Sequence, residues 1–141
     1  MPYREKIAWL SLVAIVVAFG PYFSIVALSP PPDDVLPNLG QLGLLGTATL
    51  LQVLILGIGH FSLRRLSPQD ALLPLDERDR AIEHRSFRFA YYVLIGGMIV
   101  VGCVMPFNST GWSIVNSAVL MIIAAELVHF GFVAYSYRRQ V

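Results

Sequence analysis

The basic residues of this chain are confined to three stretches of the sequence. All ten Lys and Arg residues lie before residue 7, between residues 64 and 88, or after residue 137. Four predominantly apolar windows, residues 7–28, 39–63, 87–105 and 112–135, each have roughly the 17 to 25 residues that a helix needs to cross a membrane. The sequence therefore predicts an all-α, polytopic membrane protein, an antiparallel bundle of four transmembrane helices that forms one domain over residues 1–141.

The composition agrees with a membrane protein and argues against a water-soluble one. Charged residues make up 13% of the chain, whereas soluble domains average about 25%. The mean hydropathy is +0.67. The net charge is only +1 because acids share the central stretch with the arginines, so we expect a lipid bilayer and no nucleic acid as the partner of this surface.

The distribution of basic residues also predicts an orientation. Arg4 and Lys6 precede the first window, six arginines lie between residues 64 and 88, and Arg138 and Arg139 follow the last window. Residues 29–38 and 106–111 contain no Lys or Arg. The positive-inside rule then places both termini and the 64–86 loop in the cytoplasm. The prolines of the 29–38 segment favour a stiff, extended hairpin with Asp33 and Asp34 at its tip.

The single cysteine limits the chemistry that the chain can perform. Cys103 lies inside the third window and cannot form an intramolecular disulfide, a C-x-x-C redox pair or a thiolate metal site alone. A small apolar filler is its expected role.

The 64–86 loop contains two helix-start signals. Ser67 followed by Pro68 predicts a short helical turn that ends before Pro74. Asp76 is then expected to cap a second helix, with acids in its first turn where the helix dipole favours them. No helix-breaking residue follows before Pro106, so this helix should project two to three turns into the cytoplasm before entering the membrane.

The run from residue 75 to residue 82, LDERDRAI, resembles a group of small, uncharacterised prokaryotic four-helix membrane proteins. That group carries an Asp-Glu-Arg motif in the cytoplasmic loop before the third transmembrane helix. The resemblance implies a cell inner membrane and lends no catalytic residue. A capped helix start explains the same residue types without a partner. The partner-docking candidates are Asp76, Glu77, Arg78, Asp79 and Arg80.

Glu126 is the one charged side chain deep within a predicted span, and such residues are functional candidates because burying a charge in lipid is costly. It precedes Arg138 by twelve residues, as Gln52 precedes Arg64. Both side chains should therefore lie about 18 Å from the inner interface, at 1.5 Å per residue. Gln52 and His129, the latter one turn from Glu126, are the expected polar partners.

A metal or haem site is a less favoured interpretation of the polar residues within the spans. The candidates are His60, Glu126 and His129. Glu-x-x-His is a di-iron spacing, but such a site needs two of these motifs and two further Glu residues. As haem ligands, His60 and His129 would be staggered by about 7 Å along parallel helices. We therefore expect no cofactor.

Small residues predict where helices approach each other closely. Such residues let membrane helices pack backbone to backbone, and Pro21 should bend the first helix. Gln41 and Asn116 should lie at similar depth nearer the outer face. The small residues in question are Gly40, Gly43 and Gly46 of the second window, and Gly96, Gly97 and Gly102 of the third.

Three functions fit these observations. The favoured one is a non-catalytic regulatory or partner-binding subunit that docks a cytoplasmic protein through the 64–86 loop. The second is a small proton-coupled transporter that works as a homodimer around Glu126. The third is a metal- or haem-binding membrane protein. No nucleophile with an adjacent base, phosphate loop or carboxylate pair is evident, so hydrolytic catalysis is the least favoured.

Overall fold

The computed structural model describes residues 2–32, 38–109 and 111–139, and the regular secondary structure of this part of the chain is entirely helical, without a strand. The predicted hairpin with Asp33 and Asp34 at its tip lies outside the described residues. The helices are α1 (Tyr3–Leu28), α2 (Leu39–Leu66), α3 (Pro68–Ala71), α4 (Glu77–Ile99) and α5 (Trp112–Arg138), with a π-helical turn at Val100–Val104 and a 3₁₀ turn at Met105–Phe107 between the last two.

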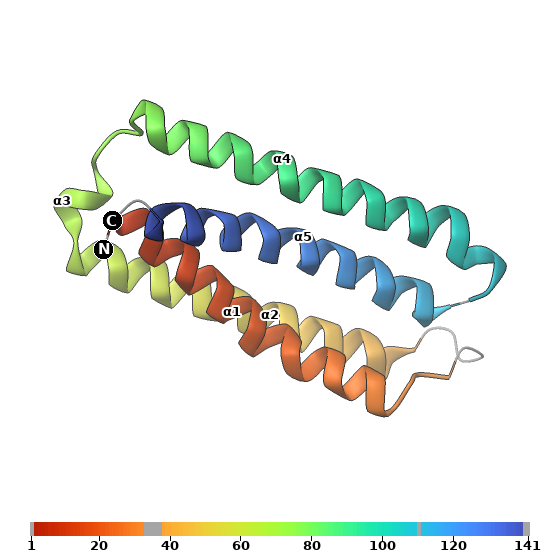
Figure 1. Cartoon of the computed structure of the whole chain (residues 1–141). Helices are drawn as coiled ribbons and strands as arrows, with labels where there is room; N and C mark the ends of the chain where they lie inside the picture. Colours follow the sequence, from red (N-terminus) through yellow and green to blue (C-terminus); the bar gives the residue numbers. More distant parts are fainter. Residues whose placement is uncertain (1, 33–37, 110, 140–141) are drawn as a thin grey trace.

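The long helices lie side by side, with α5 in the middle (Figure 1). α5 packs on α4 along one side and on α1 along another, and α2 packs mainly on α1. Both ends of the chain lie at the same end of the bundle (Figure 1). Four helical stretches, α4 with its two following turns included, are long and apolar enough to cross a membrane. The prediction of a helical multi-pass membrane protein is confirmed at this level.

The core lies where α1 contacts α2 and α5. The buried face of α1 recurs every three or four residues, as one stripe of a helix does, and α1 runs through Pro21 as a single helix. The core residues are Ile15, Ala18, Phe19 and Tyr22 of α1, Ala48 of α2 and Ile123 of α5. The outer faces of α2 and α4 carry exposed large apolar side chains, as expected of surfaces that face lipid.

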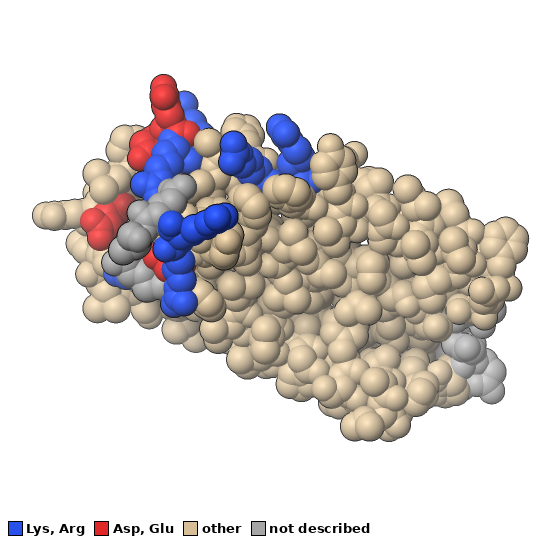
Figure 2. Space-filling view, in the orientation of Figure 1, with Lys and Arg blue, Asp and Glu red and all other residues tan. Residues whose placement is uncertain are grey.

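Charged side chains gather at the end of the bundle that holds both termini. Figure 2 shows Lys, Arg, Asp and Glu at this end of the visible face, and other residues over most of its remainder. We call this the charged end of the bundle. It contains the start of α1, the end of α2, the start of α4 and the end of α5.

The predicted helix starts in the 64–86 loop are confirmed. Pro68 begins the short α3, and the Asp76 carboxylate accepts a hydrogen bond from the Asp79 amide at 2.6 Å. The expectation of an unbroken α-helix as far as Pro106 holds only to Ile99, after which the hydrogen bonding widens to the π type. Pro106 has no N–H to donate to the carbonyl four residues earlier, which explains why the α pattern ends before it.

Most of the predicted small-residue contacts are wrong. A methyl group at Gly43 or Gly46 would meet nothing within 4 Å, so this strip of α2 faces away from the bundle. The prediction holds at Gly97, which lies against Met121. A further close approach, which was not predicted, occurs at Gly59, where a β-carbon would lie 2.5 Å from Leu10. Glycine spacing identifies a face of a helix, but it does not say which way that face points.

Candidate functional site

Three helix termini meet at the charged end of the bundle because their buried stripes reach it. The buried face of α1 begins at Glu5 and continues through Ala8. On α4 the buried positions are Ile82, Ser86 and Ala90, and Asp79 precedes Ile82 by three residues on the same face. The buried face of α5 ends at Tyr137. Polar residues at the ends of these stripes therefore point toward one another.

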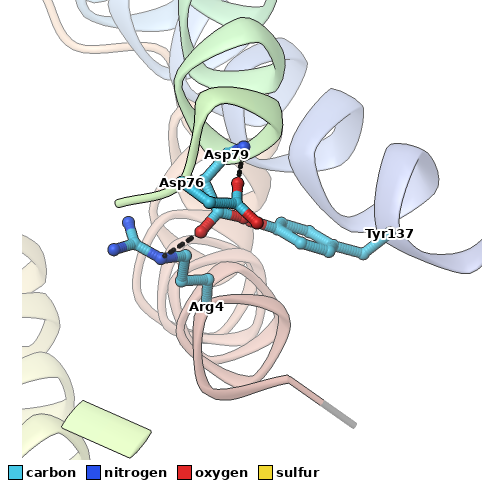
Figure 3. Close-up of polar contacts among 4 residues, drawn as sticks. All are labelled: Arg4, Asp76, Asp79 and Tyr137. Carbon is cyan, nitrogen blue, oxygen red and sulfur yellow. Dashed lines mark hydrogen bonds and ion pairs between the residues drawn. The ribbon is translucent and has the colours of Figure 1, made fainter. Parts of the chain in front are cut away.

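Asp79 is the centre of this junction (Figure 3). Its carboxylate forms an ion pair with Arg4 of α1, at 3.2 Å between Oδ2 and Nε, and accepts a hydrogen bond from the Tyr137 hydroxyl of α5. The Asp79 side chain is 17% exposed, so water screens these contacts less than it screens a surface pair. One carboxylate thus connects α4 to both α1 and α5.

A second ion pair joins α1 and α5 directly. The Glu5 carboxylate lies 3.6 Å from Nε of Arg138, and its side chain is only 6% exposed whereas that of Arg138 is 66% exposed. The Arg138 guanidinium also lies over the Trp9 ring, 4.8 Å from its centroid. Lys6 reaches Ser67 at 3.5 Å and so links α1 to the start of α3. Side-chain contacts therefore link the helices at the charged end, and these charged residues are not simply solvated surface groups.

Beside Asp79 lies a cavity of about 150 Å³ between α1, α4 and α5. We call it the junction cavity. Its polar lining is Arg4, Asp79, Glu83, His129 and Tyr137, and its apolar lining is Ile7, Ala8, Ile82, Phe130 and Val133.

His129 forms one wall of the junction cavity. Its ring stacks on Phe87 with 4.2 Å between centroids, and its Nδ1 atom is buried without a hydrogen-bond partner. Glu83 lines the same cavity, and Glu126 precedes His129 by three residues on α5. The cavity therefore has titratable groups along its length, from Asp79 and Tyr137 to His129, with Glu126 one turn further along α5.

The predicted pairing of Glu126 with Gln52 is not formed. Glu126 is exposed on α5, Gln52 is half-buried on α2, and α2 packs mainly on α1. Equal spacing from the nearest arginine predicts a similar depth for the two residues, but it does not fix how each helix is rotated about its axis. Glu126 and His129 do lie one turn apart, but no hydrogen bond joins them in the described part of the chain.

Asn116 has a different partner from the one its depth suggested. It accepts a hydrogen bond of 2.5 Å from the buried Tyr22 hydroxyl, which ties the last part of α1 to the first part of α5, away from the charged end. The Gln41 side-chain oxygen is buried without a partner.

The metal candidates stay apart. His60 is exposed on α2, whereas Glu126 and His129 belong to α5. Within the described ranges, no group of three or more His, Cys, Asp and Glu side chains is placed to hold a metal ion.

The docking candidates divide into two sets. Asp76 caps α4 and Asp79 points inward to Arg4 and Tyr137. Glu77, Arg78 and Arg80 are exposed and keep their side chains available to a partner.

Sequence reasoning missed the roles of Glu5, Glu83 and Tyr137. Glu5 could have been recognised by its spacing, because it stands three residues before Ala8 on the stripe that leads into the α1 core. Tyr137 resembles the other interfacial aromatics in sequence. Its contact with Asp79 spans 58 residues, and no local pattern reveals such a contact.

The fold and the charged end define a small, helical multi-pass membrane protein whose helix termini are joined by ion pairs. Comparisons of the chain with protein-family models, with curated proteins and with solved structures find no match.

Proposed function

We propose that this protein is a non-catalytic subunit of the cell inner membrane that docks a cytoplasmic protein through the start of α4. In this proposal the bundle is antiparallel and both termini face the cytoplasm, as the grouping of basic residues favours. The docking surface consists of the exposed residues Glu77, Arg78 and Arg80.

The double contact of Asp79 is the observation that carries this proposal. By holding the first turn of α4 against Arg4 and Tyr137, it fixes the positions of the neighbouring exposed charges. A surface that is already ordered loses less conformational entropy on binding, and so binds more tightly for the same contacts. Asp79 would then position the docking surface without touching the partner.

Site-specific photo-crosslinking in native membranes tests the docking surface. A crosslinker at position 78 or 80 should give the same discrete protein adduct, and one at the exposed control position Arg64 should not give it. Asp79→Ala should weaken the adduct because the first turn of α4 loses its anchor. Equal adducts from all three positions, or adducts with lipid alone, would rule out a docking surface at α4.

A second candidate function, proton-coupled transport by a homodimer, is favoured by a different observation. Glu126 is exposed on the outer surface of the bundle, and His129 and the junction cavity continue from it toward the charged end. An ionisable residue at such a site is expensive in lipid unless it is protonated or paired. A second copy of the chain is the partner we propose for this surface.

Reconstituted vesicles test this second function. Under a pH gradient, Glu126→Gln should abolish substrate flux, Glu126→Asp should keep part of it, and the exposed control Glu77→Gln should keep all of it. The absence of pH-driven flux of cationic and lipophilic substrates in the unmodified protein would remove this candidate.

A further inference from the structure

The charges around the junction cavity do not balance. Arg4 and Asp79 neutralise each other through their ion pair, and Tyr137 uses its hydroxyl on Asp79. Glu83 has no ion-pair partner among the described residues. His129 adds a buried Nδ1 atom without a hydrogen bond. A carboxylate and an unsatisfied ring nitrogen thus border the same space, and a hydrogen-bond donor with positive charge would satisfy both.

The remaining wall of the cavity is apolar, so a molecule bound there needs an apolar part to contact it. This apolar wall consists of Ile7, Ala8, Ile82, Phe130 and Val133. The ring of Phe130 can also contact a cation through its face. A cavity of about 150 Å³ is large enough for a benzene-sized body. The cavity lies next to the ion pairs of the charged end and, through His129, next to the apolar length of α5. Molecules with one charged and one apolar end concentrate at such a boundary.

We propose that the junction cavity is a binding site for a small organic ammonium, with the ammonium group between Glu83 and His129 and the apolar body against Ile82, Phe130 and Val133. The Arg4–Asp79 pair closes the end of the site toward the chain termini and excludes a second cation there. Two sources share this chemistry, a free amine and the headgroup of an ethanolamine lipid.

Fluorine NMR on the full chain in detergent tests the site with 4-fluorobenzylammonium as the probe and the neutral 4-fluorobenzyl alcohol as its isostere. The ammonium should bind saturably and at least about tenfold more tightly than the alcohol, since hydrogen bonds to charged groups are the stronger ones. Glu83→Gln should remove this preference. The control Asp70→Asn changes an acid of α3 that is exposed, as Glu83 is, but does not line the cavity, and it should leave the preference unchanged.

Val133→Phe provides a second, independent variant, because the larger ring fills the cavity and should abolish binding of both probes. Nanodiscs with and without phosphatidylethanolamine distinguish the two sources: a headgroup site predicts that this lipid weakens probe binding, and a free-amine site predicts no change. Equal affinity for ammonium and alcohol, no saturable binding, or the same loss in Asp70→Asn as in Glu83→Gln would overturn the proposal. The measurement involves neither flux nor a protein partner, so its outcome is independent of both functions proposed above.

Discussion

Tyr135 and Tyr137 stand two residues apart on α5 but have different environments. Tyr135 is 58% exposed, whereas Tyr137 is 7% exposed and donates its hydroxyl to Asp79. Removing a buried hydrogen bond to a carboxylate costs about 1.5–3 kcal/mol, so Tyr137→Phe should lower the free energy of unfolding by that amount. Tyr135→Phe should change it by less than about 0.5 kcal/mol. Thermal unfolding in detergent measures both variants, and equal melting temperatures would show that the Asp79 contact does not stabilise the fold.

At the scale of the element, Gly96 and Gly97 offer a matched pair within α4. A methyl group at Gly97 would collide with Met121 of α5, whereas one at Gly96 would meet nothing within 4 Å. Gly96→Ala should stabilise the helix by up to about 1 kcal/mol through helix propensity. At Gly97 an overpacking cost of about 1–3 kcal/mol opposes that gain. Gly97→Ala should therefore unfold at a lower temperature than Gly96→Ala, and the reverse order would contradict the α4–α5 packing.

Elements that are specified locally could be predicted from the sequence. The four apolar helices, the short α3 and the Asp76 cap all follow from residues close together in the chain. The rotation of each helix about its axis could not be predicted, because every long helix is apolar on several faces. For this reason the sequence did not reveal that Gly43 and Gly46 face away from the bundle.

The candidate site was only partly predictable for the same reason. Glu126 and His129 were found because a charge and an imidazole stand out in an apolar span. The junction cavity was not found, since it depends on Arg4, Asp79 and Tyr137 from three separate helices. Asp79 was selected as a docking residue for its place in the motif, and the structure turns it inward.

For the whole molecule, the decisive property is that the charged end holds both termini and the start of α4 (Figures 1 and 2). Arginine and lysine resist transfer across a membrane, so we expect this end to stay in the cytoplasm. Reporter fusions after residues 34, 75, 109 and 141 should then read outside, inside, outside and inside. The fusion after residue 75 is the most informative, because it lies directly before the α4 turn that Asp79 joins to Arg4 and Tyr137. If it read outside while the fusion after residue 141 read inside, the start of α4 and the end of α5 would lie on opposite sides of the membrane. The Asp79–Tyr137 contact could not then form. This result would rule out both the proposed docking surface and the ammonium site.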